Sequence, residues 1–221
     1  MSLTKIPSRT DYVDTVYTSL RDAISDGTLL PGERITQEDL AAKLHVSRSP
    51  VLQALRLLKK DGLLEEAPGR GLLVTPLDPD RIGHLYQVRG ALDALAARLA
   101  AERGKTISAS LIQKGRDITQ GDDVRGMIEA DMAFHRAIYA ASGNPLILNN
   151  AELHWVHFRR VMGAVLQRSA SRQGIWDEHE AIANAINAGD ASLAARLSEA
   201  HAEAARISLT QHLRRTDKSA A

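Results

Sequence analysis

The sequence of 221 residues contains no cysteine, only 4% aromatic residues and no long apolar run. Without thiols there is no disulfide framework, and any metal site must use histidine and carboxylate ligands. Because no segment of 18 or more apolar residues occurs, we expect no membrane span. The N-terminal stretch also lacks the apolar core of a signal peptide, so the expected compartment is the cytoplasm.

A strong net charge is also absent, since the whole chain carries only +1. Residues 1–80 contain 10 Lys and Arg against 12 Asp and Glu, so bulk charge does not indicate a nucleic-acid partner. Positive charge is concentrated only within residues 45–76, where five basic side chains outnumber three acidic ones. An apolar fraction of 44% and a charged fraction of 25% are typical of a globular protein.

Residues 36–64 predict a short helix, a tight turn through His45 and Val46, and a longer helix that begins at Ser47. Ser47 is expected to cap that helix, because its hydroxyl can accept a backbone N–H of the first turn. A helical wheel places three apolar side chains on one face, namely Val51, Leu55 and Leu58. The opposite face carries Ser49, Gln53, Arg56 and Lys60.

This pattern favours a helix-turn-helix whose second helix enters a DNA major groove. An ordinary amphipathic helix with a solvated face is the alternative. Directly after it, the segment APGRGLLVTP predicts two short strands around a glycine turn, which is a wing. Arg70 lies at its tip, where flanking glycines allow a close approach to a phosphate or the minor groove.

The GER segment, the SRSPV run with its DGLL ending, and the GRG..VTP turn resemble the winged-helix domain of the GntR family of bacterial transcription regulators. The resemblance covers about residues 10–76. It implies that Arg34, Arg48 and Gly71 contact DNA. From their exposed positions we expect five further side chains to contact DNA as well: Ser47, Ser49, Gln53, Arg56 and Arg70. Leu52 departs from the family, which usually has an arginine after the Pro-Val pair. The wheel puts Leu52 at the edge of the outward face.

The two prolines of the segment TPLDP mark a boundary between domains 1–76 and 77–221. Beyond it we expect six helices separated by glycines: Asp80–Arg103, Ser108–Thr119, Asp123–Ala141, Pro145–Arg168, Arg172–Asn187 and Asp190–Arg215. The predicted fold is therefore mainly α, with an N-terminal winged helix-turn-helix and a C-terminal all-α bundle of six or seven helices. Residues 1–10 and the final TDKSAA are expected to be frayed or disordered.

Polar side chains interrupt the apolar stripes of three bundle helices. Asp131 and His135 lie one turn apart on the third bundle helix, while His179 and His201 lie on the fifth and sixth. A single buried histidine is usually a hydrogen-bonded core residue, but this group supplies a thiol-free ligand set that suits zinc, nickel or manganese. Small residues around His201 leave room for a ligand.

The segments DMAFHRAIYAASGNP and WDEHEAIANAINAGD, with a histidine one helix later, are similar to the FCD ligand-binding domain of the FadR subfamily. The resemblance covers about residues 80–215 and implies a divalent metal, zinc above all, at Asp131, His135, His179 and His201. Six helices suggest the shorter, VanR-like branch. The family also has an arginine in the setting that VRGALDAL matches, which implies an effector site at Arg89.

Arg89 lies in an apolar stripe and therefore needs an anion, because a guanidinium stays charged. Asp93, one turn later, is one candidate partner, and the carboxylate of a bound effector is the other. His154 is a weaker candidate for the effector pocket. His157, Arg159 and Arg160 are expected on a solvated or dimer-facing surface.

Three functions are compatible with these features. The first is a homodimeric regulator, most commonly a repressor in this family, whose binding to a palindromic DNA operator depends on a small organic acid bound over a metal. The second is a regulator that senses the metal itself. The third is a metallohydrolase with a helical accessory domain, although no general base, nucleophile elbow or phosphate loop is evident.

Overall fold

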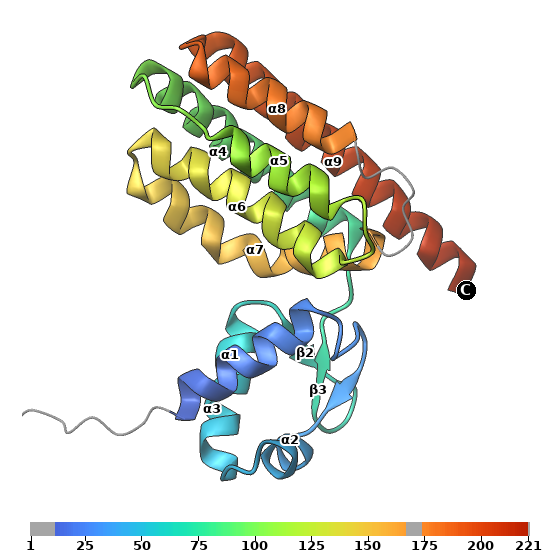
Figure 1. Ribbon diagram of the computed structural model, residues 1–221. Helices are drawn as coiled ribbons and strands as arrows, with labels where there is room; N and C mark the ends of the chain where they lie inside the picture. The colour runs from blue at the N-terminus through green and yellow to red at the C-terminus, as the bar shows by residue number, and fades with distance from the viewer. Residues whose placement is uncertain (1–11, 167–173, 221) are drawn as a thin grey trace, which may run out of the picture. The chain divides into compact units, whose positions relative to one another are not determined.

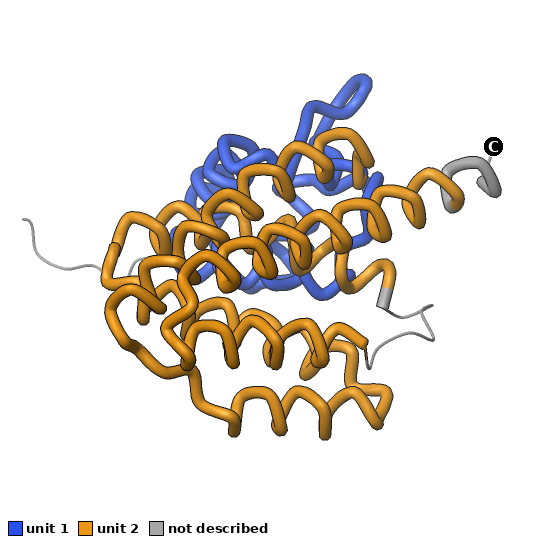
Figure 2. Tube along the Cα trace, turned by 90° about the horizontal axis from the view of Figure 1, so that it is seen from above, with its two compact units in different colours: residues 1–76 blue, residues 77–221 orange. Residues whose placement is uncertain are grey.

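The computed structural model describes residues 12–166 and 174–220. The chain divides into two compact units, residues 1–76 and 77–221, which Figure 2 colours separately. Residues 1–10, for which an arm is expected, lie outside the described residues. The mainly helical fold with a small N-terminal wing is confirmed.

The first unit packs its helices around a small apolar core (Figure 1). Helix α1 (Tyr12–Ser25) and helix α2 (Gln37–Leu44) both contact α3 (Arg48–Lys60). The apolar face predicted for α3 is buried, and it consists of Val51, Leu55 and Leu58. The turn between α2 and α3 is the predicted one, since His45 ends α2 in the left-handed region at φ 52°.

The Ser47 side chain does not cap α3 as the sequence predicts. Ser47 occupies the N-cap position with an extended backbone, but its hydroxyl makes no capping hydrogen bond. A capping side chain accepts an N–H from the second or third helical residue; Pro50, the third, has none, so Ser49 is left as the one possible donor. Ser47 is exposed, so its hydroxyl is open to solvent or to a ligand.

The wing is a three-stranded antiparallel sheet rather than the predicted two-stranded hairpin. Strands β2 (Leu64–Glu66) and β3 (Leu72–Val74) form the hairpin, and β1 (Arg34–Ile35) adds to the outer edge of β3. A strand of two residues carries no periodicity, so the sequence pattern did not reveal β1. Its pairing brings Arg34 opposite Leu73, beside the turn of the wing.

The second unit is an antiparallel bundle, drawn in green to red in Figure 1. Its helices are α4 (Pro79–Glu102), α5 (Ala109–Ile118), α6 (Val124–Ser142), α7 (Pro145–Leu166), α8 (Gly174–Asn187) and α9 (Ala191–Ala220). Helix α4 runs along α9 and also contacts α6, α7 and α8. A β-carbon on Gly90 of α4 would lie 3.2 Å from the Ala202 side chain, so the small residue allows this close approach.

Two sequence expectations for the bundle are wrong. Residues 216–220 of the TDKSAA segment are helical, because α9 continues to Ala220 and no glycine or proline follows Gly189 to end it; Ala221 lies outside the described residues. His157 and Arg160 are buried rather than solvated, since α7 is covered by α4, α6 and α9 on more than one side. Arg159 is partly buried and pairs with Glu129.

Within the described ranges, no helix combines the length and apolarity that a membrane crossing requires.

Candidate functional site

The outward face of α3 is open to solvent, as a DNA-reading helix requires. Its expected side chains Ser49, Gln53, Arg56 and Lys60 are all exposed. Arg48 begins the helix and is also exposed, although it lies 3.4 Å from the Glu38 carboxylate. Leu52 is 40% exposed, which agrees with its expected place at the edge of this face.

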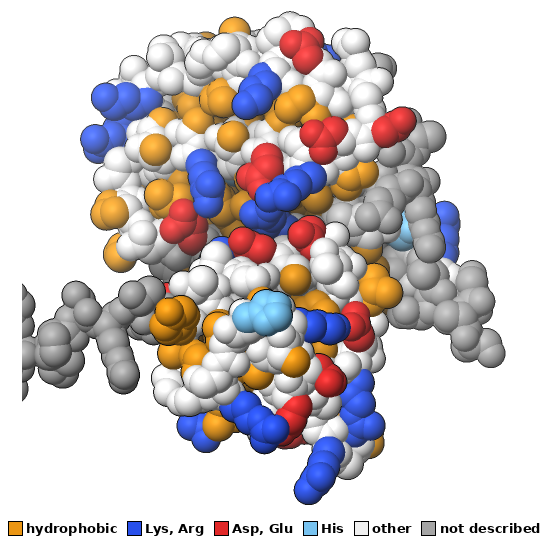
Figure 3. Space-filling view, turned by 60° about the horizontal axis from the view of Figure 1, so that its bottom comes forward, with side chains coloured by type: hydrophobic (Ala, Val, Ile, Leu, Met, Phe, Trp, Pro, Cys, Tyr) orange, Lys and Arg blue, Asp and Glu red, His pale blue; other side chains and the backbone are white. Residues whose placement is uncertain are grey.

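The electrostatic character of the first unit is mixed. On the face shown in Figure 3, blue Lys and Arg side chains lie beside red Asp and Glu side chains at the lower end of the molecule. Two ion pairs contribute to this mixture, Arg48 with Glu38 and Lys59 with Glu66. Binding to polyanionic DNA therefore depends on a few placed cations rather than on a uniformly basic surface.

The wing brings Arg34, Arg70 and Gly71 together. Arg70 is exposed at the tip between Gly69 and Gly71. The Arg34 side chain does not extend freely into solvent, because its Nε donates to the Arg70 carbonyl at 2.8 Å and its Nη2 donates to the Pro68 carbonyl at 2.6 Å.

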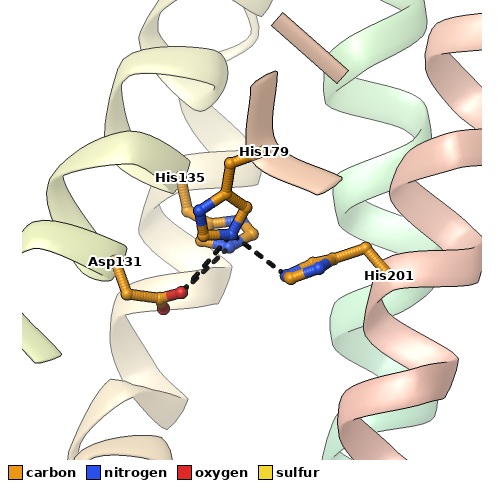
Figure 4. A group of neighbouring side chains, drawn as sticks. All are labelled: Asp131, His135, His179 and His201. Carbon is orange, nitrogen blue, oxygen red and sulfur yellow. Dashed lines mark hydrogen bonds and ion pairs between the residues drawn. The ribbon is translucent and has the colours of Figure 1, made fainter. Parts of the chain in front are cut away.

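In the second unit, four side chains from three helices converge on one point (Figure 4). Helix α6 supplies Asp131 and His135 one turn apart, α8 supplies His179 and α9 supplies His201. All four are buried, and one ligand atom from each lies within 4.8 Å of the others. The fold therefore brings together the four residues that helical spacing predicted on buried faces of separate helices.

The distances between these atoms suit one metal ion. His179 Nε2 lies 3.2 Å from His201 Nε2 and 3.5 Å from Asp131 Oδ1, and His135 Nε2 lies 3.8 Å from Asp131 Oδ1. Two ligands of a tetrahedral zinc ion, each at about 2.0–2.1 Å, are separated by about 3.4 Å. In addition, among the described residues no hydrogen-bond partner reaches the buried His135 Nε2. The residues present thus fit a divalent cation.

A different neighbour orients each of the three histidine rings. His135 Nδ1 lies 3.5 Å from the Asp93 carboxylate, and His201 Nδ1 lies 2.7 Å from that of Glu178. A carboxylate at Nδ1 holds the proton there and leaves Nε2 bare toward a metal.

The ring of His179 is held by aromatic contacts. Phe134 stacks on it with centroids 4.2 Å apart, and Trp176 meets it edge-on at 4.7 Å. His179 is fully buried, so these two rings leave it little freedom to turn.

The electrostatics keep the rings of His135 and His179 in the neutral form that a metal requires. Burial, followed by the nearby positive charge of Arg89, lowers the pKa of His135 well below its usual value. Burial also lowers the pKa of His179, with a further contribution from His201. Neutral imidazoles offer a lone pair at neutral pH, whereas protonated rings do not.

Arg89 on α4 is buried and has two carboxylate partners, Asp93 and Asp131. Its Nε lies 3.4 Å from Asp93 and its Nη2 lies 3.5 Å from Asp131 Oδ2. Burial is the largest single influence and disfavours the charged form, but Asp93, Tyr86, Asp131 and Tyr139 together outweigh it, so the pKa of Arg89 is raised. Asp131 therefore offers one oxygen to the histidines and the other to Arg89.

A cavity of about 290 Å³ adjoins this cluster. Its polar lining includes Arg89, Asp131, Glu178 and His201, and small residues such as Ala204 and Ala205 widen it. The space that the sequence suggests beside His201 therefore exists. His154 does not line this cavity; it is half-buried on α7, and burial together with Arg81 lowers its pKa.

Sequence reasoning missed the carboxylates that support the cluster. Glu178, which precedes His179 on α8, reaches His201 on the neighbouring helix. Asp93 was considered only as a partner of Arg89, although it also contacts His135 and accepts a hydrogen bond from the Tyr139 hydroxyl. Burial raises the pKa of both Asp93 and Tyr139.

Comparison with known proteins assigns both units. The model of the bacterial regulatory proteins of the gntR family matches residues 12–74, and that of the FCD domain matches residues 84–204. The HTH-type transcriptional regulator YdhC of Bacillus subtilis is 31% identical over 165 residues, which span 72% of this chain and 74% of that protein. The "Probable D-xylose utilization operon transcriptional repressor" of Paenarthrobacter nicotinovorans is 28% identical over 90% of both chains.

A solved structure of a GntR transcriptional regulator from Rhodococcus sp. RHA1 superimposes with a TM-score of 0.76. It is 25% identical and covers 90% of this chain and 98% of its own. The matched families and relatives are regulators of transcription rather than enzymes, which removes the metallohydrolase interpretation. The chain belongs to the GntR family of bacterial regulatory proteins: it is a DNA-binding transcriptional regulator with an FCD domain.

Proposed function

We propose that this regulator is a homodimeric repressor of the FadR subfamily whose operator binding is controlled by a small organic acid held beside a divalent metal. The observation that carries the proposal is the convergence of three histidines and one aspartate next to a cavity lined by an arginine. A regulator of this kind needs a chemical input, and this is a buried polar site of the right size for one.

Asp131, His135, His179 and His201 would hold the ion, with zinc as the first candidate and nickel or manganese as alternatives. When bound, the ion supplies a Lewis-acidic site with room for further oxygen ligands. Asp93 and Glu178 keep the bare Nε2 atoms of two rings directed inward, and Phe134 and Trp176 hold the third ring. The protein thus preorganises the ligand set before the ion arrives.

Arg89 is the residue assigned to the effector carboxylate. Its contacts with Asp93 and Asp131 are long, at 3.4 and 3.5 Å, so its fork is not saturated by good hydrogen bonds. A carboxylate in the cavity can accept from the same guanidinium and lie beside the metal position. The largely apolar remainder of the lining favours an acid with a small hydrocarbon body, and His154 has no direct part in this arrangement.

The proposals for the dimer, the operator and the sign of regulation rest on the family assignment. Two copies of α3 spaced one DNA turn apart would read a palindromic operator. The six helices of the described part of the bundle favour the VanR-like branch. Two relatives are named as repressors, which supports repression relieved by the effector. A protein that regulates transcription in bacteria would work in the cytoplasm.

The test is thermal denaturation of the full chain after chelation, after loading with zinc, nickel or manganese, and after adding small carboxylic acids. An effector at 100 times its Kd should stabilise the folded state by about 2.7 kcal/mol. Asp131→Asn should strongly reduce the metal-dependent shift, because a charged carboxylate ligand becomes a neutral amide. Arg89→Lys should keep the metal shift and lose the acid shift. If neither chelation nor any acid changes the transition, the effector proposal fails.

A regulator that senses the metal itself is the competing function, and the buried four-residue ligand set favours it. In that case zinc alone should change affinity for operator DNA, and carboxylic acids should not change it further. The Arg89→Lys variant should then respond to metal as the wild type does. The same set of measurements therefore separates the two functions.

A further inference from the structure

We propose that Arg34 is a positioning residue of the wing: its guanidinium fixes the turn of residues 67–71 and so presents Arg70 to DNA. The family resemblance implies a direct DNA contact for Arg34. The geometry assigns the fork of this side chain to the protein's own backbone instead. DNA binding through the wing then depends on Arg34 indirectly, through the place of Arg70.

The first observation is the pair of hydrogen bonds that Arg34 makes across the turn. Its Nε donates to the Arg70 carbonyl at 2.8 Å, and its Nη2 donates to the Pro68 carbonyl at 2.6 Å. These carbonyls flank Gly69, so a single side chain holds both sides of the tip. A guanidinium can do this because its donors form a rigid planar fork, whereas a lysine ammonium is a point donor on a flexible stem.

The second observation is that little else fixes the tip. Pro68, Gly69 and Arg70 are all exposed, so the turn gains no stability from apolar burial. Gly69 and Gly71 have φ values of +87° and +92°, a region that glycine enters freely but also leaves freely. One backbone bond, from Ala67 N–H to the Gly71 carbonyl at 3.3 Å, closes the base of the turn. Ordering the tip before DNA arrives lowers the entropic cost of binding.

The third observation is the close contact between β1 and the turn. A β-carbon on Gly71 would lie 2.8 Å from the Ile35 carbonyl oxygen, which is backbone and cannot rotate away. Gly71 thus lets β1 come near enough for Arg34 to reach the tip. Gly71→Ala should push β1 and the turn apart while leaving Arg34 and Arg70 in the chain. It therefore tests the Arg34 hydrogen bonds to the turn without removing either arginine.

The experiment is a double-mutant cycle on DNA affinity. The probe is a duplex of about 30 base pairs, recovered from a randomised pool by binding to the wild-type protein. Arg34→Ala and Arg70→Ala should each weaken binding roughly tenfold and lower the slope of log K against log salt by about one. The double variant should be no weaker than either single variant, because both remove the same contact.

Two further variants sharpen the cycle. Arg34→Lys keeps the charge but not the fork, so it should resemble Arg34→Ala. Gly71→Ala should reproduce the loss and add nothing to Arg34→Ala. As the matched control, Arg48→Ala lies on α3 and should combine additively with Arg34→Ala. Circular dichroism melting checks folding, and if Arg34→Ala does not fold, Arg34→Lys and Gly71→Ala take its place in the cycle.

The proposal is overturned if the losses from Arg34→Ala and Arg70→Ala add, with the salt slope falling by about two, because Arg34 then contacts DNA itself. It is equally overturned if Arg34→Lys binds as the wild type does, or if either single alanine variant has no effect.

Discussion

In the first unit the charged side chains assigned to DNA stand in solvent, whereas in the second unit the charged side chains assigned to a ligand are enclosed by helices. Arg48 makes one exposed ion pair with Glu38. Arg89, by contrast, is buried among two carboxylates and the rings of Tyr86 and Phe158. An exposed charge is solvated whether or not it is paired, but a buried one must be partnered by the protein. Function and stability should therefore be separable in the first unit and coupled in the second.

The largest expected effect comes from removing the carboxylate at the centre of the buried network. Asp93→Ala leaves Arg89 without its nearer anion and removes the partner of the Tyr139 hydroxyl and of His135 Nδ1. We expect a loss of about 3–5 kcal/mol in the free energy of unfolding, because the buried Arg89 charge keeps only the Asp131 carboxylate as a partner. Both tryptophans, Trp155 and Trp176, lie in the second unit, so urea titration followed by tryptophan fluorescence measures this loss.

The matched control for that loss is Asp80→Ala, which breaks an exposed ion pair with Arg214. It should cost little, since exposed pairs contribute weakly. A loss below about 1 kcal/mol for Asp93→Ala would mean that burial does not couple stability to the ligand site as we infer.

At the start of α3 we expect a substitution to lower DNA affinity without lowering stability. Arg48→Ala should weaken binding to operator DNA by about tenfold or more, because a base or phosphate contact is lost. The melting temperature should stay close to that of the wild type, since the side chain is exposed. Mobility-shift titration and circular dichroism provide the two measurements. Sequence-specific binding that persists unchanged would remove α3 as the recognition helix.

Overpacking behind the ligand cluster should disturb stability and metal affinity together. A methyl group added at Gly115 on α5 would overlap the Trp176 ring, which in turn holds His179. Gly115→Ala should therefore cost about 1–3 kcal/mol and weaken zinc binding in a competition titration. Gly121→Ala is the control, because an added methyl there meets nothing closer than 3.8 Å. Unchanged zinc affinity in Gly115→Ala would show that the ring does not position His179.

The two units also differ in what their sequence could predict. Periodicity placed Asp131 and His135 on a buried face of α6 and the apolar side of α3 correctly, because both depend on one helix alone. Contacts between helices depend on how the helices turn and pair, which one sequence does not specify. The Glu178–His201 contact and the burial of His157 are of that kind.

Local rules failed where two of them competed. Ser47 has the right residue type for a cap, but Pro50 removes one of the two N–H groups that its hydroxyl could accept. The strand β1 is too short for any pattern, yet it determines where the Arg34 guanidinium lies. Exposed candidate residues could be named from residue type and helix face, whereas their hydrogen-bond partners required the fold.

The smallest expected effect concerns a hydrogen bond between two elements of the first unit. The Tyr17 hydroxyl of α1 donates to the Asp61 carboxylate, at the C-terminal end of α3, at 2.7 Å. Burial and this bond raise the pKa of Tyr17 to about 12. Tyr17→Phe removes one partly exposed hydrogen bond, so it should cost about 1 kcal/mol and leave DNA affinity nearly unchanged.

The pH dependence of stability provides a second test of this hydrogen bond. The unfolded tyrosine loses its proton near pH 10 and the folded one near pH 12, so this contribution to stability is complete below pH 10 and declines as the pH rises above it. Chemical denaturation of the wild type at pH 9 and pH 11 should show a decline that is smaller in Tyr17→Phe. Equal declines in the two proteins would mean that Tyr17 titrates alike in the folded and unfolded states. In that case even this partly buried contact of the first unit would behave as a solvated one, unlike the buried charges of the second unit.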